Sequence, residues 1–118
     1  MSLAANIVVA LIALLHVYIL VLEMFLWDKP AGRRAFGLTQ EMATSTKALA
    51  ANQGLYNGFL AAGLFWGLWL GSAGLAVKVF FLLCVLVAGV FGAATASRKI
   101  LFIQAVPAAI GLALVLLA

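Results

Sequence analysis

Four long apolar runs, each nearly free of charged residues, dominate the sequence. They cover about residues 5–27, 48–70, 75–97 and 100–117. A helix rises 1.5 Å per residue, so about 20 residues cross a hydrocarbon core of about 30 Å. The runs are continuous rather than alternating, which favours helices over a β-barrel. The sequence therefore predicts an all-α fold, namely an integral membrane four-helix bundle that forms one transmembrane domain over residues 1–118.

The composition excludes several classes of protein. Hydrophobic residues make up 68% of the chain and charged residues 8%, whereas a soluble domain has about 25% charged residues. A small soluble fold leaves roughly a third of the surface area of its unfolded chain exposed to water, so it could not bury this many apolar residues. The composition therefore argues against a soluble enzyme, a nucleic-acid-binding protein and a disordered chain. Cys84 is the one cysteine, so an internal disulfide and a cysteine-built zinc site are excluded. We expect no cofactor and no metal.

Basic residues predict the orientation in the membrane. Six of the seven fall between the first and second runs or between the third and fourth, and the positive-inside rule places both segments in the cytoplasm. Both termini are then outside, and Lys78, early in the third run, is expected to extend to the outer headgroups. The six residues are Lys29, Arg33, Arg34, Lys47, Arg98 and Lys99.

The segment between the first and second runs is predicted to be a short cytoplasmic loop. Pro30, Gly32 and Gly37 are expected to break any helix at its start. Thr39 followed by Gln40 and Glu41 is typical of a helix N-cap with an acid in the first turn. A short interfacial helix leading into the second run is therefore one interpretation of this loop.

Two ionisable residues lie inside the first run. His16 is at its middle, and Glu23 follows seven residues later on the same helical face. They are about 10 Å apart along the axis, so their partners must come from other helices or from water. The 4, 3, 4, 3, 4 spacing predicts a face that packs inside the bundle. This face reads Val9, Ala13, His16, Leu20, Glu23 and Trp27.

Further polar residues lie at a similar depth in the second and fourth runs. With the orientation above, Glu23 and these groups occupy a layer roughly 0–14 Å from the cytoplasmic surface, and His16 lies below it at about 16 Å. We therefore expect a polar cavity that opens to the cytoplasm. The alternatives are that the amides join helices and that Glu23 pairs with a loop cation such as Lys47. The candidate binding residues are His16, Glu23, Asn52, Gln53, Tyr56, Asn57 and Gln104.

Small residues and one proline suggest two features of the packing. Gly54, Gly58 and Ala61 form a face on the second run that we expect to be available to a second copy of the chain, giving a homodimer. Pro107 removes a backbone hydrogen bond from the fourth run and is expected to kink it near Ile103.

Several sequence motifs resemble one known family. Glu23-Met24-Phe25-Leu26-Trp27 follows the mid-span histidine, and the string Asn52-Gln53-Gly54-Leu55-Tyr56-Asn57-Gly58 is specific. With Gly32-Arg33 and Phe36-Gly37-Leu38, they resemble the small bacterial integral membrane proteins catalogued as domain of unknown function 1304 (DUF1304). The resemblance implies a four-helix architecture and a multi-pass location in the bacterial inner (cytoplasmic) membrane, and it brings no established activity.

The polar layer predicts a protein that binds or transports a small polar or amphipathic molecule, or a lipid. One alternative is an accessory subunit of another membrane protein. Another is a membrane-embedded enzyme acting on a lipid-like substrate, with Glu23 or His16 as general base. One histidine and one acid are few groups for catalysis, and the sequence shows no nucleophile motif or phosphate-binding loop. We therefore assign no catalytic residue. The expected partners are the lipid bilayer and a second copy, and no nucleic acid.

Overall fold

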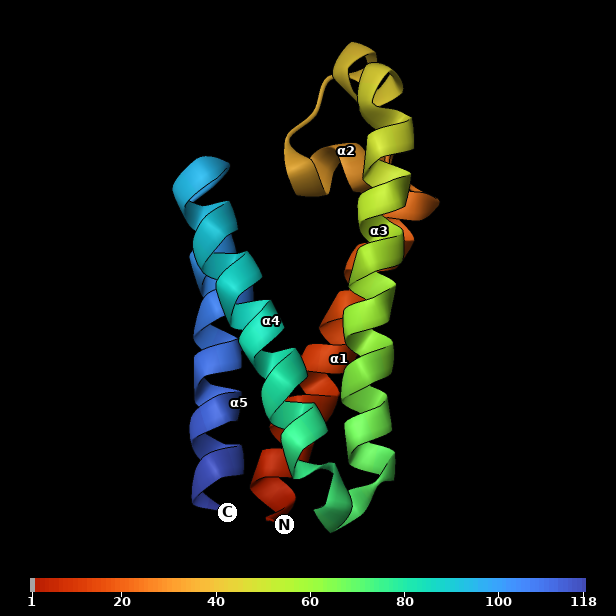
Figure 1. The fold of residues 1–118 in the computed structure, drawn as a ribbon. Coiled ribbons are helices and arrows are strands. Elements are labelled where there is room, and N and C mark those ends of the chain that lie inside the picture. The colour runs from red at the N-terminus through yellow and green to blue at the C-terminus, as the bar shows by residue number, and fades with distance from the viewer. Residues whose placement is uncertain (1) are drawn as a thin grey trace. The chain divides into compact units, whose positions relative to one another are not determined.

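The chain is helical over most of its length. The computed structural model describes residues 2–118, and the prediction of an all-α chain is confirmed. Each of the four apolar runs overlaps one of the long helical stretches. In chain order, the elements are α1 (Leu3–Met24), α2 (Pro30–Phe36), α3 (Gln40–Trp69), the 3₁₀-helix η1 (Gly71–Gly74), α4 (Leu75–Thr95), the π-helix η2 (Leu101–Ala105) and α5 (Val106–Leu117) (Figure 1).

Two helical stretches are long and apolar enough to cross a membrane. They are Leu3–Met24 and Gly71–Thr95, judged by length and composition, and Leu101–Leu117 is an apolar but shorter helix. The 30 residues of α3 give it a length of about 45 Å. Its first half carries many polar residues, which distinguishes it from the two apolar stretches. Leu3–Met24 and Gly71–Thr95 are thus the structural support for association with a membrane.

The helices divide into two compact units, and α1 and α3 contribute to both. Unit 1 consists of residues 2–14 and Leu60–Ala118, which are the start of α1, the end of α3 and everything from η1 to α5. Unit 2 is Leu15–Phe59, which contains the rest of α1, α2 and the first part of α3.

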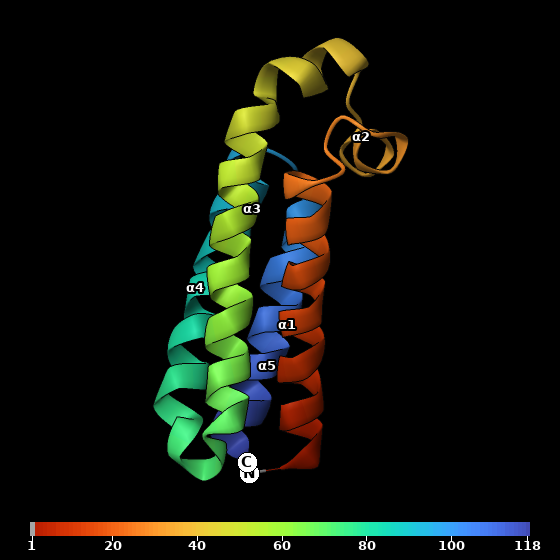
Figure 2. The same ribbon diagram turned by 90° about the vertical axis from the view of Figure 1, so that its right-hand side faces the viewer.

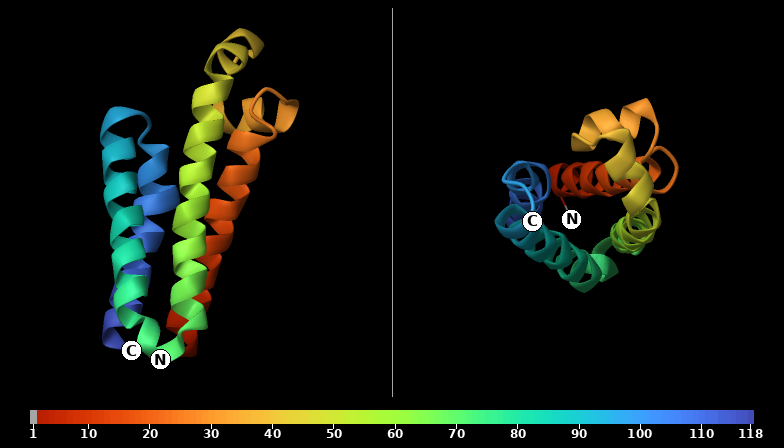
Figure 3. Two further views of the ribbon diagram at one scale, coloured as in Figure 1. Left: turned by 45° about the vertical axis from the view of Figure 1, so that its right-hand side comes forward. Right: turned by 90° about the horizontal axis from the view of Figure 1, so that it is seen from above.

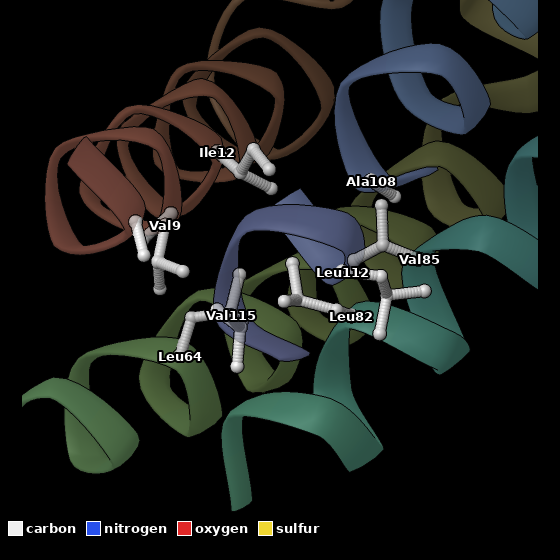
Figure 4. Close-up of a cluster of buried hydrophobic side chains, with 10 residues drawn as sticks. Val9, Ile12, Leu64, Leu82, Val85, Ala108, Leu112 and Val115 are labelled. Atoms are coloured by element: carbon white, nitrogen blue, oxygen red, sulfur yellow. The ribbon is translucent and has the colours of Figure 1, made fainter. Parts of the chain in front are cut away.

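Unit 1 is built around an apolar core. Side chains from α1, α3, α4 and α5 meet there, and α4 and α5 run side by side (Figures 3 and 4). The start of α1, η1 and the end of α5 lie at the same end of this unit (Figure 3). The predicted inward face of α1 is confirmed here, because Val9 and Ala13 are fully buried. The buried core residues are Ala5, Val9, Ile12, Ala13, Leu64, Leu82, Val85, Ala108, Leu112 and Val115.

The fourth run departs from α-helical geometry where a disturbance was predicted. Its first part, η2, is π-helical and contains Ile103, and Pro107 lies in the first turn of α5. Proline is well accommodated in a first turn, where its missing N–H is not needed. Gly89 of α4 lets the two backbones approach, since a Cβ at this position would lie 2.6 Å from the backbone nitrogen of Ala105.

Lys78 does not lie where the sequence predicted. Its side chain is 0% exposed, so it does not extend to a headgroup region. The stem packs against Gly67, where an added Cβ would lie 2.7 Å from Lys78 Cγ. Because Gly67 has no side chain, it leaves room for the aliphatic stem of Lys78. Packing this stem against apolar surface is favourable. Within residues 2–118, Lys78 Nζ has no hydrogen-bond partner.

Unit 2 contains a helix that the sequence analysis did not expect. Pro30 is the first residue of α2 rather than a breaker, because proline suits the first helical turn. The helix ends at Phe36 and is capped by Gly37, whose φ of 65° and ψ of 41° are left-handed and favour glycine. Figure 2 shows the chain leaving α1, passing through α2 and turning back into α3.

The predicted cap at Thr39 is confirmed. Its Oγ1 accepts a hydrogen bond of 3.1 Å from the backbone N–H of Met42, and α3 begins at Gln40. The helix then continues without interruption to Trp69. The short helix expected in the loop is therefore the first part of α3 itself, and its place at a membrane interface stays a prediction.

Candidate functional site

A buried carboxylate with two amide partners forms the polar centre of unit 2. Glu23, near the end of α1, is 1% exposed. Its Oε1 accepts a hydrogen bond of 2.6 Å from Asn57 Nδ2, and its Oε2 accepts one of 2.9 Å from Gln53 Nε2. Both amides belong to α3 and are one helical turn apart, so they present their donors on one face. We call Glu23, Gln53 and Asn57 the carboxylate cluster.

Glycines in α3 bring the two helices close enough for these hydrogen bonds. A Cβ at Gly54 would lie 2.6 Å from Met24 Cγ and 3.1 Å from Glu23 Cβ, and a Cβ at Gly58 would lie 2.7 Å from Leu20 Cδ1. Small residues allow such close helix contacts. The face formed by Gly54 and Gly58 therefore packs against α1 of the same chain, rather than lying free for a second copy.

A pocket of about 240 Å³ lies beside the carboxylate cluster. Most of its wall is apolar, and Glu23, Gln53 and Thr46 contribute polar groups. Pockets that bind small molecules are commonly apolar with a few well-placed polar groups, although most are larger. The lining residues are Glu23, Trp27, Leu38, Met42, Thr46, Leu49, Ala50 and Gln53.

Side-chain contacts hold Trp27 at the wall of this pocket. Its indole Nε1 donates a hydrogen bond of 3.0 Å to Thr46 Oγ1 on α3. Its ring packs on Phe36 of α2, with ring centroids 4.7 Å apart. These two contacts fix both the polar edge and the face of the indole, and they connect α2 and α3 to the chain that follows α1.

An ion pair lies in the same region. Lys47 Nζ is 3.2 Å from Asp28 Oδ2, and the lysine side chain is 58% exposed. The hydrogen bond from Lys47 holds the pKa of Asp28 below its usual value. One alternative from the sequence was a pair between Lys47 and Glu23. The structure instead pairs Lys47 with Asp28.

The structure brings together three of the seven predicted binding residues, Glu23, Gln53 and Asn57. Asn52 and Tyr56 are exposed, Tyr56 by 55%, and neither lines this pocket. Each precedes a cluster amide by one residue, which turns it about 100° around the helix and away from Glu23.

The other two predicted residues are not part of the carboxylate cluster. His16 is fully buried, as its place on the inward face of α1 predicted, and it does not line the pocket. Gln104 belongs to η2, in unit 1. A binding role for either residue stays a prediction.

A family model described as "Protein of unknown function (DUF1304)" matches residues 10–116. The chain belongs to the DUF1304 family. The match includes Glu23, Gln53 and Asn57, and it confirms the resemblance seen in the sequence.

One relative of this DUF1304 protein is a curated bacterial sequence. This chain is similar to the uncharacterized protein YpaA of Lactococcus lactis subsp. lactis (strain IL1403), with 30% identity over 106 residues. The matched region covers 88% of this chain and 89% of YpaA. No solved structure matches the chain.

Six residues of the pocket wall were not identified as site residues from the sequence: Trp27, Leu38, Met42, Thr46, Leu49 and Ala50. A usable signal was present, because Met42, Thr46, Leu49, Gln53 and Asn57 follow one another at spacings of 4, 3, 4 and 4. Such spacing predicts one packed face of a helix. In the described residues 2–118, no group of three or more His, Cys, Asp and Glu residues is arranged to hold a metal ion.

Proposed function

We propose that this DUF1304 protein is a multi-pass protein of the bacterial cytoplasmic membrane that binds a small polar or amphipathic molecule in the pocket beside Glu23. The observation that carries the proposal is the carboxylate cluster. A buried carboxylate in an apolar setting is costly, and here it stands at the wall of a pocket rather than in a closed core. Apolar walls with one strong acceptor suit an amphipathic ligand.

The proposed membrane arrangement has four spanning helices, formed by α1, α3, α4 and the stretch from η2 to α5. The apolar stretches Leu3–Met24 and Gly71–Thr95 support two of these spans. The distribution of basic residues supports the orientation with α2 in the cytoplasm and η1 outside. A test uses single cysteines in a Cys84→Ser background. A membrane-impermeant thiol reagent added to intact cells should label Ser72→Cys and leave Gln40→Cys unlabelled, and the reverse pattern would refute the orientation.

Ligand binding can be followed through Trp27, which lines the pocket. In the double variant Trp66→Phe, Trp69→Phe, Trp27 is the one remaining tryptophan. The protein is reconstituted in nanodiscs of neutral lipid and titrated with cationic, neutral and anionic amphiphiles of the size of one aromatic ring. We expect a saturable change in Trp27 fluorescence with at least one class.

A pair of variants on α3 tests whether binding takes place in this pocket. Leu49→Tyr places a bulkier side chain at the pocket wall, and Leu55→Tyr makes the same change at an exposed position outside the pocket. The first variant should weaken binding and the second should not. If no class produces a saturable change, the proposal is refuted. Copurification of one stoichiometric membrane protein, without ligand binding, would instead favour an accessory subunit.

A homodimer is also proposed, but its interface needs another surface. Gly54 and Gly58 are occupied by α1, and Ala61 is 2% exposed. The mass of the protein in mild detergent and in nanodiscs tests for the dimer.

A further inference from the structure

Within the described residues 2–118, the Glu23 carboxylate has amide partners and forms no ion pair. Amide donors stabilise a carboxylate without neutralising its charge. Across residues 2–118, the ion pair that forms joins Lys47 to Asp28 instead. A buried acid that keeps its charge is normally paired with a cation or reached by water. The pocket beside Glu23 is the place from which a counter-charge can be supplied.

The carboxylate also has acceptor capacity left for a ligand. An ionised carboxylate offers about four lone-pair positions. The hydrogen bonds from Asn57 and Gln53 occupy one position on each oxygen. A ligand that donates one or two N–H groups would therefore complete the shell of Glu23 without displacing either amide.

The charges of the pocket wall select the sign of the ligand. Glu23 is the one ionisable residue among the residues that line it. None of the seven basic residues lines the pocket, and Lys47 is already engaged by Asp28. An anion would meet like charge at short range in a medium of low dielectric, whereas a cation would be attracted.

The rest of the wall fits the apolar body of such a ligand. Leu38, Met42, Leu49 and Ala50 provide aliphatic and thioether surface, and methionine adapts to ligands of different shape. Trp27 adds an indole whose N–H is already used by Thr46. Indole is the aromatic group that binds cations best, and the part of the Trp27 ring that is not covered by Phe36 is available to do so.

We propose that the pocket takes an amphipathic ammonium ion, a small primary amine with an apolar body, whose N–H groups donate to Glu23. This inference rests on the proposed function and narrows it to one ligand class. The pocket volume of about 240 Å³ matches a single aromatic ring with a short amino-bearing arm.

The test compares three probes of nearly equal size that differ in charge: 2-phenylethylamine, 2-phenylethanol and phenylacetate. Binding is measured to the full chain in phosphatidylcholine nanodiscs, and empty nanodiscs correct for partition into lipid. We expect the amine to bind at least about tenfold more tightly than the alcohol, since a buried charge pair adds this much or more. Phenylacetate should bind weakest.

The matched variants are Glu23→Gln and Glu41→Gln. The first keeps the shape of the site and removes its charge. The second makes the same change on an exposed acid of α3 outside the pocket. Glu23→Gln should lower the affinity for the amine at least about tenfold and leave that for the alcohol within about twofold. Glu41→Gln should change neither.

The outcomes separate this inference from the proposed function. If the alcohol binds as tightly as the amine and Glu23→Gln changes nothing, the pocket binds amphiphiles but the ammonium proposal is refuted. Tightest binding of phenylacetate refutes it as well. If no probe binds, the proposed function itself fails. Should Glu23→Gln not fold, the order of the three affinities in the unmodified protein still decides the proposal.

Discussion

The two units of the molecule each bury one charged side chain, and they treat it differently. In unit 2, Glu23 is 1% exposed and receives hydrogen bonds from Gln53 and Asn57. In unit 1, Lys78 is 0% exposed, and its Nζ has no hydrogen-bond partner in the described residues 2–118. The same helix, α3, offers Glu23 two amides at the spacing of a turn but offers the lysine stem a glycine, Gly67.

This difference shows that burial of a charge does not by itself identify a functional site. The Glu23 carboxylate is held by donors from another helix and also lines a pocket. Lys78 shares the burial but neither of these features among the groups described. We therefore assign the candidate site to unit 2, and we expect the two charges to respond in opposite ways when their surroundings are changed.

The largest effect is expected from removing an amide donor while the carboxylate stays. Asn57→Ala leaves one oxygen of Glu23 without its shortest hydrogen bond. The variant should lose about 2–3 kcal/mol of unfolding free energy, the cost typical of a hydrogen bond to a charged group. Unfolding by denaturing detergent measures it. In a Glu23→Gln background the same substitution should lower the unfolding free energy by less. Equal losses in both backgrounds would contradict the conclusion that the Asn57 amide stabilises the charge of Glu23.

Glycines at helix contacts provide the second test. Gly89→Ala in unit 1 would place its Cβ 2.6 Å from a backbone nitrogen, whereas Gly54→Ala in unit 2 would place it 2.6 Å from Met24 Cγ, with the nearest backbone atom, the Leu20 oxygen, at 3.3 Å. Since backbone cannot move aside as a side chain can, we expect a loss of about 2 kcal/mol for Gly89→Ala and a smaller loss for Gly54→Ala. Thermal unfolding of the two variants in parallel would show whether this order holds.

The third effect has the opposite sign. Lys78→Met keeps the length and apolar character of the side chain and removes the ammonium group. Replacing a buried charge with an apolar side chain is often stabilising, and we expect a gain of about 1–2 kcal/mol. A higher melting temperature than that of the unmodified protein is the expected readout. A lower one would show that the ammonium group is held as firmly as the Glu23 carboxylate.

The smallest effect is expected from the ion pair at the pH where Asp28 titrates. Lys47 lowers the pKa of Asp28 in the folded chain. The pair therefore contributes its stability above the unfolded pKa of about 3.9, and this contribution is lost as the pH falls through the lower, folded value. Asp28→Asn should flatten the stability profile in this acidic range and leave it nearly unchanged near pH 7. Stability that falls equally in acid for both proteins would argue against the pair. Because the Lys47 side chain is 58% exposed, the pair should also weaken in salt.

Much of the fold follows from local patterns in the sequence. The long apolar runs predicted the long helices, and the spacing along α1 predicted that Val9, Ala13, His16 and Glu23 are buried. The cap at Thr39 was predicted from one short motif. These features depend on the period of a helix and on bonds between near neighbours, so they can be read without knowledge of the tertiary structure.

The features that were missed depend on which helices pack together. The sequence shows Asn52, Gln53, Tyr56 and Asn57 as one polar cluster, but a helix can turn only part of it toward α1. Gly54 and Gly58 determine which part, because they set the side on which α1 packs. The burial of Lys78 likewise depends on Gly67, eleven residues away and on another helix. Pro30 was misread for a simpler reason, since the start of a helix had to be known before a proline could be placed there.

The π-helical segment η2 bears on how the length of this chain can vary. A π-turn closes between residues five apart rather than four, so it holds one residue more than an α-turn. Loss of one residue within Leu101–Ala105 can therefore be absorbed if the turn becomes α-helical. The buried side of α5, with Ala108, Leu112 and Val115, would then still face the core. A deletion within α5 itself would rotate the residues that follow it by about 100°, so a one-residue gap should be tolerated in η2 and rejected in α5.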